Sequence, residues 1–134
     1  MPMIIVRYVT PNPLPGLEDR IAAAVSGWSA DHLGKDPGVT AVLVEPAAGR
    51  NWWIAGRRPV DDGLSAFWID VKVTAGTNVK AETTRFVEAA FSGMSALLGP
   101  THAESYVLVH GVDGHAYGYG GRTQEGRWAA ANPG

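Results

Sequence analysis

The residue with the clearest chemical potential in this sequence is Pro2, because a run typical of a buried strand follows it at Met3–Val9. If Met1 is removed, Pro2 carries a free secondary amine at the first position of a β-strand. An α-amino group titrates at about pH 8, and burial in an apolar pocket lowers its pKa further by disfavouring the charged form. The proline ring also fixes one backbone dihedral, which holds the nitrogen lone pair in place. Pro2 is therefore a candidate general base, although many chains begin Met-Pro without such chemistry.

Other kinds of catalytic chemistry have little support in the sequence. The chain has no cysteine, which removes disulfides, thiolate catalysis and cysteine-bound metal. Its four histidines show no metal-ligand spacing, so no metal site is expected. The glycine-rich run Tyr117–Gly121 lacks the Gly-Lys-Ser/Thr ending of a phosphate loop, and we expect no helix after it.

The 134-residue chain has the composition of one small domain, residues 1–134, or of two fused half-size units. Apolar residues make up 46% of the chain and charged residues 18%, which is typical of a globular protein rather than a disordered one. A net charge of −2 without a basic stripe argues against nucleic acid and anionic membranes as partners. Because there is no signal-peptide pattern and no apolar run that could cross a bilayer, we expect a cytoplasmic protein.

The chain repeats its own pattern, because residues 1–60 and residues 65–134 each predict a strand, a helix, a second strand and a short hairpin. The glycines that end the two hairpin segments, Gly56 and Gly121, are 65 residues apart. The predicted strands are Met3–Val9, Thr40–Glu45, Phe67–Val73 and Tyr106–Val112, and the predicted helices are Leu17–Leu33 and Val79–Leu98. Strand–helix–strand units cross over right-handed, which makes the two strands of each unit parallel. The predicted fold is therefore α/β (α+β), with two fused β-α-β units forming a four-stranded mixed sheet and two helices on one face.

Apolar residues at helical spacing predict the buried side of each helix. They are Leu17, Ile21, Ala24, Val25 and Trp28 in the first helix, and Phe86, Val87, Ala90, Phe91, Met94, Leu97 and Leu98 in the second. Seven strand residues are expected to point to both faces of the sheet: Ile4, Ile5, Val6, Ile69, Val71, Val107 and Val109. Because the helices cover one face only, copies of the same chain would most simply cover the other. We therefore expect a closed homo-oligomer, with a monomeric two-layer sandwich as the alternative.

Three features together resemble the tautomerase superfamily: Pro2 at the start of a β-α-β unit, the doubling of that unit, and the run Tyr117–Gly121 near the end. The doubled length is similar to the cis-3-chloroacrylic acid dehalogenase branch rather than to the half-length 4-oxalocrotonate tautomerases. The segment Asn51–Gly56 resembles the first hairpin of that branch. The resemblance implies a homotrimer, an active site where the amino-terminal proline meets a neighbouring protomer, and chemistry without a metal or organic cofactor.

The arginines with which this superfamily binds carboxylates are missing from the matching positions. Half-length members have arginines where this sequence has Asn12 and Ala41, and the dehalogenase branch has them where it has Thr74 and Thr77. The water-activating glutamate of that branch falls near Tyr119. An unpaired carboxylate in an apolar site is costly, so hydrolytic dehalogenation is not favoured. We expect a keto–enol substrate that is less anionic or bulkier than a dicarboxylate.

Thr74 and Thr77 are candidates for substrate binding at the positions of the missing arginines, and five more side chains join them. Trp52 and Tyr117 match positions at which the superfamily places an aromatic wall over the proline, although core or subunit packing would use such residues equally well. Tyr119 could donate a hydrogen bond to an enolate oxygen, or it could simply pack in its hairpin. Arg7 and Lys72 are the cations of the first and third strands. Either could replace the missing arginines as an anion anchor, or face solvent.

Together these residues predict a cofactor-independent tautomerase or isomerase. Its base, Pro2, would remove a proton next to a carbonyl of a small-molecule carbonyl compound or unsaturated acid and return it to a conjugated carbon. One alternative is a catalytically silent tautomerase-fold binding protein in which Met1 stays and the Pro2 nitrogen is an amide. The other is a hydratase, dehalogenase or decarboxylase acting on an unsaturated acid, which needs a water activator and a cationic clamp.

Overall fold

Two β-α-β units follow one another along the chain, and a small hairpin and a third helix come after them. The computed structural model describes residues 2–134, so that Met1 and its predicted removal lie outside the described residues. The main elements are β1 (Met3–Val9), α1 (Leu17–Leu33), β2 (Ala41–Pro46), β3 (Ala66–Thr74), α2 (Lys80–Leu98), β4 (Tyr106–Val112), β5 (Gly118–Tyr119), β6 (Arg122–Thr123) and α3 (Gln124–Ala131). Short 3-10 turns occupy Pro37–Val39, Gly49–Asn51 and Pro59–Asp62.

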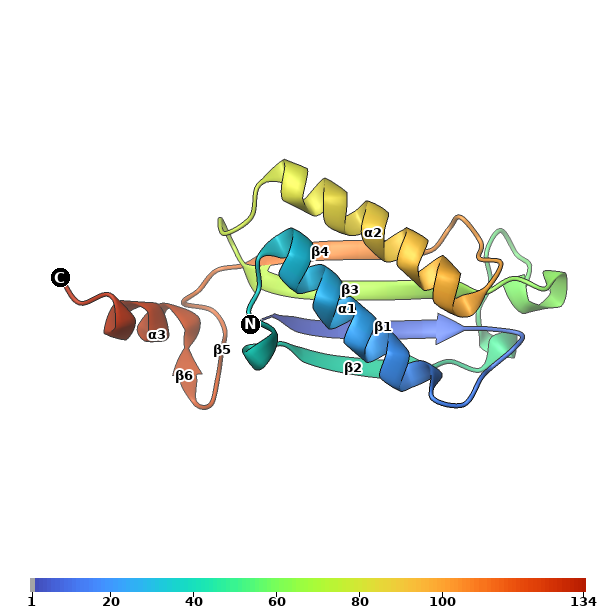
Figure 1. Cartoon of the computed structure of the whole chain (residues 1–134), viewed down its shortest axis with the longest axis horizontal. Coiled ribbons are helices and arrows are strands. Elements are labelled where there is room, and N and C mark those ends of the chain that lie inside the picture. Colours follow the sequence, from blue (N-terminus) through green and yellow to red (C-terminus); the bar gives the residue numbers. More distant parts are fainter. Residues whose placement is uncertain (1) are drawn as a thin grey trace.

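The four long strands form one mixed sheet in the order β2-β1-β3-β4. β1 is parallel to β2, and β3 is parallel to β4, while β1 and β3 run antiparallel at the centre. Helices α1 and α2 pack together across one face of this sheet (Figure 1). The predicted α+β architecture is confirmed. It brings the amino end of β1 and the carboxyl ends of β3 and β4 to the same end of the sheet.

Local signals explain why the helices begin and end close to their predicted positions. Helix α1 follows Gly16, which has φ 77°, and ends at Gly34, which has φ 67° and donates its N–H to the carbonyl of Ser29. Helix α2 begins one residue later than predicted because Val79 is its N-cap. The Val79 N–H donates to the Glu82 carboxylate at 2.8 Å, which lowers the pKa of Glu82.

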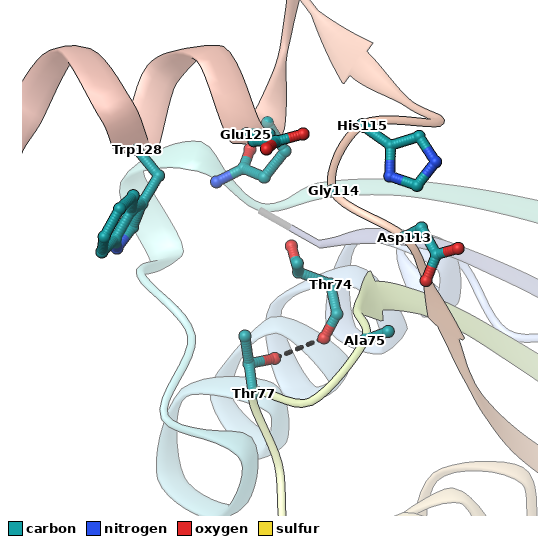
Figure 2. Close-up of a pocket in the computed structure, with 9 residues that line it drawn as sticks. Thr74, Ala75, Thr77, Asp113, Gly114, His115, Glu125 and Trp128 are labelled. Atoms are coloured by element: carbon teal, nitrogen blue, oxygen red, sulfur yellow. Dashed lines mark hydrogen bonds between the residues drawn. The ribbon is translucent and has the colours of Figure 1, made fainter.

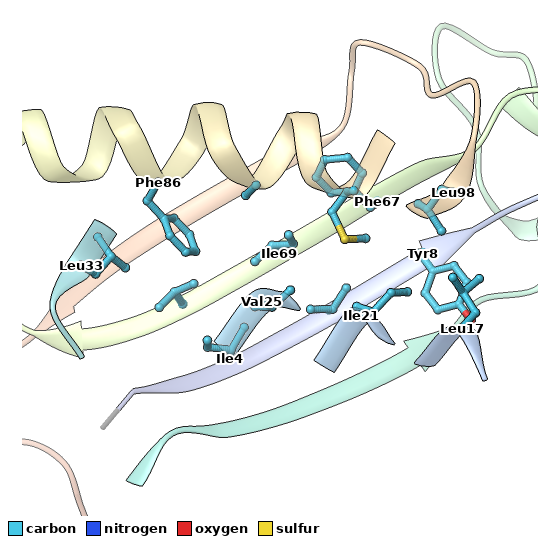
Figure 3. Packing of buried hydrophobic residues seen from close by; sticks show 14 of the residues in the cluster. Ile4, Tyr8, Leu17, Ile21, Val25, Leu33, Phe67, Ile69, Phe86 and Leu98 are labelled. Carbon is cyan, nitrogen blue, oxygen red and sulfur yellow. The ribbon is translucent and has the colours of Figure 1, made fainter. Parts of the chain in front are cut away.

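The hydrophobic core lies between the helices and the sheet (Figure 3). Its sheet residues are Ile4, Val6, Tyr8, Phe67, Ile69, Val71 and Val73, and its helix residues are Leu17, Ile21, Val25, Leu33, Phe86, Ala90, Met94 and Leu98. Trp28, Phe91 and Leu97 pack against it partly buried. The prediction is wrong for Val87, which is 36% exposed. The buried stripe of α2 advances in steps of four residues from Phe86, and Val87 lies beside it on the outer surface.

The face of the sheet opposite the helices is open in the protomer. The sequence predicted that seven strand residues would be divided between the two faces of the sheet. Only Ile5 of these seven lies on the open face, because the other six point to the helix face and pack in or against the core. The open face nevertheless carries apolar side chains that the prediction did not include. They are Met3, Leu43, Trp68, Tyr106 and Leu108. The physical argument for a partner therefore rests on these residues.

Each β-α-β unit continues into a turn segment beyond its second strand. In the first unit, Ile54 pairs with Arg57 across a two-residue turn. Both turn residues have positive φ, 51° at Ala55 and 78° at Gly56, which matches the twist of a tight hairpin. In the second unit, β5 and β6 form the predicted hairpin.

The expectation that no helix follows the glycine-rich run is wrong, because α3 begins directly after β6. The Thr123 side chain caps α3 by accepting the N–H of Gly126 at 3.0 Å. Helix α3 and the β5–β6 hairpin extend beyond the sheet at the end where β1 begins (Figure 1). Within residues 2–134, no helix is long and apolar enough to span a bilayer.

Candidate active site

Pro2 lies at the amino end of β1 with its side chain fully buried. Its carbonyl oxygen accepts the backbone N–H of Ala41 at 3.0 Å, which continues the pairing of β1 with β2. The β5–β6 hairpin lies at the same end of the sheet (Figure 1). Pro2 is thus held in a defined position at this end of the sheet.

A cavity of about 310 Å³ adjoins Pro2. Its lining residues are Pro2, Met3, Val39, Ala41, Lys72, Tyr117, Gly118 and Tyr119. The lining is mostly apolar, and Lys72 is its one charged member within the described chain. Such surroundings disfavour the charged form of an amine, so a free amine in this position would have a depressed pKa.

Lys72 supplies a positive charge to this cavity from the open face of β3. The strand register places it opposite Met3 of β1 and His110 of β4. Its Nζ lies 2.6 Å from Oδ1 of Asp70, two residues earlier on the same strand face. An ammonium group has three N–H donors, so this ion pair leaves donors for a ligand.

A chain of hydrogen bonds ties Tyr117 to the loop between β3 and α2. The Tyr117 hydroxyl is hydrogen-bonded to Oγ1 of Thr74. The Thr77 hydroxyl donates to the Thr74 carbonyl at 2.6 Å and accepts from Nζ of Lys35 at 3.0 Å. Burial lowers the pKa of Lys35, and the charge of Glu82 opposes that shift. Thr74 and Thr77 therefore support Tyr117 from behind and do not line the Pro2 cavity.

Tyr119 forms an outer wall of the cavity and is 40% exposed. Arg127 of α3 lies over its ring, with Cζ 3.9 Å from the ring centroid. The same guanidinium donates from Nη2 to the Tyr119 carbonyl at 2.8 Å. Sequence reasoning missed this support because it did not predict α3. It also missed Val39, whose place beside the cavity follows from the parallel pairing of β1 with β2.

A second hollow, of about 430 Å³, lies on the other side of Thr74. Figure 2 shows Thr74 and Thr77 across from Trp128 and Glu125 of α3. The Oε1 atom of Gln124, which also lines the hollow, is buried and has no hydrogen-bond partner among the described residues. Within residues 2–134, no group of three or more His, Cys, Asp or Glu side chains is placed to hold a metal ion.

Two predicted site residues, Trp52 and Arg7, lie near the other end of the sheet within the protomer. Arg7 pairs with Glu45 at 3.4 Å and lies opposite Trp68 in the β1–β3 register. Trp52 lines a separate pocket together with Trp68. The predicted residues that the structure does bring to one cavity are Pro2, Lys72, Tyr117 and Tyr119, with Thr74 and Thr77 behind Tyr117.

Comparison with solved structures places this architecture among known folds. The chain matches the symmetric trimer of a wild-type fused 4-OT with a TM-score of 0.80 and 16% identity, over 93% of this chain and 98% of that one. It matches Pt0534 inactivated by 2-oxo-3-pentynoate with a TM-score of 0.79 and 12% identity, over 92% and 97% of the two chains. A macrophage migration inhibitory factor-like protein from Entamoeba histolytica matches with a TM-score of 0.75 and 16% identity, over 91% and 97%. No protein-family model and no curated protein matches the sequence. The chain therefore has the tautomerase fold.

Proposed function

We propose that this chain, which has the tautomerase fold, is a cofactor-independent tautomerase or isomerase with Pro2 as its general base. The observation that carries the proposal is the buried Pro2 beside an apolar cavity with a single ammonium group. Such a cavity would keep a free imino nitrogen uncharged near neutral pH, where a base must be unprotonated to act. The proposal requires that Met1 be removed, because acylation would convert the nitrogen into an amide.

The reaction would move one proton in two steps. The Pro2 nitrogen takes a proton from the carbon next to a carbonyl, and the electron pair of the C–H bond forms the enolate. The Lys72 ammonium lies where it can stabilise the developing negative charge, and the ring of Tyr119 closes the outer side. Protonated Pro2 then returns the proton to a conjugated carbon, which restores the carbonyl and the free base.

The charge of the cavity favours substrates with at most one carboxylate. Lys72 is its only charged lining residue among those described, and Asp70 already offsets part of that charge. Thr74 and Thr77, which stand where the resemblance would place arginines, are engaged in internal hydrogen bonds. A dicarboxylate would leave one anion without a counter-charge, which is costly in apolar surroundings.

Exchange of the α-proton of an α-keto monoacid in D₂O, followed by NMR, tests the base directly. We expect Pro2→Ala to slow exchange by about 100-fold or more. Lys72→Gln should raise KM, while the matched change Arg7→Gln should not, because Arg7 is also a carboxylate-paired cation of the open face but lies away from the cavity. Intact mass should show the loss of one methionine. Unchanged exchange in Pro2→Ala, or full activity in protein that retains Met1, would refute the proposal.

A catalytically silent binding protein is the second candidate, and one observation favours it. The polar groups around the cavity already have protein partners: Lys72 is paired with Asp70, and the Tyr117 hydroxyl is bonded to Thr74. Retained Met1 together with ligand binding and no proton exchange would support this candidate. Water-adding chemistry is not proposed, because none of the described lining residues is a carboxylate that could activate water.

We also propose that the protein assembles as a homotrimer through the open face of its sheet. The apolar residues Leu43 and Leu108 are 44% and 36% exposed there in the single protomer. One of the fused 4-OT structures with the same fold is described as a symmetric trimer. Association of open faces would remove these side chains from water.

A further inference from the structure

A pocket of about 640 Å³ lies near the end of the sheet away from Pro2. We call it the aromatic pocket; the lining residues that matter are Trp52, Trp53, Trp68, His102, Glu104 and Tyr106. Four of these six side chains are tryptophan or tyrosine, and no lysine or arginine belongs to the described lining. The proposed chemistry of Pro2 uses none of them.

The internal repeat shows that this pocket is the counterpart of the Pro2 cavity. Moving 65 positions along the chain carries Met3 to Trp68, Val39 to Glu104 and Ala41 to Tyr106. The same offset carries Trp52 to Tyr117, Trp53 to Gly118 and Ile54 to Tyr119. Each of these six pairs has one member in the lining of each cavity. The strand register agrees, because Met3 faces Ala41 across β1 and β2 just as Trp68 faces Tyr106 across β3 and β4.

The duplicate lacks the base. The position that corresponds to Pro2 is Phe67, which lies within the chain and has an amide nitrogen. That N–H donates to Oγ of Ser105 at 3.2 Å. The aromatic pocket therefore occupies the position in the second unit that the Pro2 cavity occupies in the first, but it has no basic nitrogen at the position of Pro2.

We propose that the aromatic pocket is a second ligand site, which binds a neutral planar ring with a hydroxyl or N–H donor on its edge. The inference rests on the duplicated cavity and its side chains, and does not require that Pro2 be a base. Stacked and edge-to-face contacts with Trp and Tyr rings favour a planar partner. Trp68 and Tyr106 already adopt such a tilted arrangement, with ring centroids 5.8 Å apart and planes at 50°.

The polar edge of the pocket selects for a donor and against a carboxylate. The Tyr106 hydroxyl donates to Oε2 of Glu104 at 2.8 Å, which raises the pKa of Tyr106. Nδ1 of His102 accepts the backbone N–H of Glu104 at 3.0 Å. The remaining Glu104 oxygen can accept from a ligand, whereas its charge would repel an anion. The guanidinium of Arg58 lies 5.1 Å from the centroid of the Trp53 ring, which disfavours a cationic ligand at that ring.

Binding of p-cresol to the full chain tests the proposal, with 4-methylbenzoate and tetramethylammonium as probes of other charge. Two-dimensional NMR of the indole N–H groups localises the ligand, because the five tryptophans are distributed over different parts of the fold. We expect p-cresol to shift the signals of Trp52, Trp53 and Trp68 and to leave those of Trp28 and Trp128 in place. We expect 4-methylbenzoate to bind about tenfold more weakly or worse, and Glu104→Gln to reduce that difference.

Four results would overturn the inference. They are an absence of shifts, shifts confined to Trp128, a preference for 4-methylbenzoate, and binding of tetramethylammonium in place of p-cresol. A control on assembly uses Trp52→Ala, which should weaken p-cresol binding without changing the oligomeric state. If the wild-type protein does not bind p-cresol and Trp52→Ala dissociates the assembly, the pocket is an assembly surface instead. Loss of proton exchange in Pro2→Ala has no bearing on these outcomes.

Discussion

Replacing Gly93 with alanine should destabilise the protein although alanine is the better helix former. A Cβ atom on Gly93 would lie 1.9 Å from Cζ2 of Trp28, whose ring fills the space between α1 and α2. Carbon atoms in contact are about 3.5–4.0 Å apart, so the indole ring must move by about 1.5 Å or more. Overpacking of this kind costs about 1–3 kcal/mol, whereas Gly to Ala in a helix gains about 1 kcal/mol. We expect a net loss of up to about 2 kcal/mol in the free energy of unfolding.

The sign of the effect should reverse once the ring is removed. In a Trp28→Leu background, Gly93→Ala meets no indole, and the helix preference alone should stabilise by about 0.5–1 kcal/mol. Urea denaturation followed by circular dichroism, at one fixed protein concentration, gives the four free energies of the cycle. The interaction energy between the two positions should equal the overpacking cost, about 1–3 kcal/mol. A stabilising Gly93→Ala in the wild-type background would show that the two helices do not pack as described.

Three further changes test other parts of the structure. Burial raises the pKa of Tyr8 to about 12, and Glu18 adds to the shift. Because this pKa is about 10 in the unfolded chain, the contribution of Tyr8 to the free energy of unfolding should be fully present below pH 10 and should decrease as the pH rises towards 12. Tyr8→Phe should flatten this decrease when denaturation is measured as a function of pH. Ala55→Gly should raise the melting temperature, with a gain of up to about 1 kcal/mol, because Ala55 has φ 51° in the left-handed region. Thr74→Val should slow α-proton exchange by about tenfold in kcat with little change in KM, and Tyr117→Phe should add nothing to it, since the two hydroxyls act as one pair.

The elements with strong local signals could be predicted almost to the residue. Helix α1 has the predicted bounds because Gly16 and Gly34 both adopt positive φ at its ends. The strands alternate between core and open face, which a period of two predicts. Helix α3 was missed because its main signal is the single capping residue Thr123, and Trp128 is its one large apolar side chain. Val87 was misplaced because the buried stripe of α2 is narrower than the run of apolar residues suggests.

The candidate site was harder to predict because it depends on which end of the sheet each hairpin reaches. A hairpin that follows a strand parallel to β1 must lie at the carboxyl end of β1, away from Pro2. Trp52 is therefore remote from Pro2 within the protomer, whereas Tyr117 follows β4 and lies next to it. This step was available from the predicted topology. The contact of Arg127 in α3 with Tyr119 could not be predicted from that topology, because it depends on side chains of a helix that was not predicted.

The proposed trimer can be tested with two residues of equal exposure on opposite surfaces. Leu108 on the open face of β4 and Val87 on the outer face of α2 are both 36% exposed in the protomer. In an assembly built on the open face, Leu108→Glu would bury an unpaired carboxylate, which costs several kcal/mol, whereas Val87→Glu would remain in solvent. Sedimentation velocity should therefore show protomers for Leu108→Glu and wild-type particles for Val87→Glu, with both variants folded by circular dichroism. Dissociation caused by Val87→Glu instead would mean that the helices, and not the open sheet, make the contact between copies.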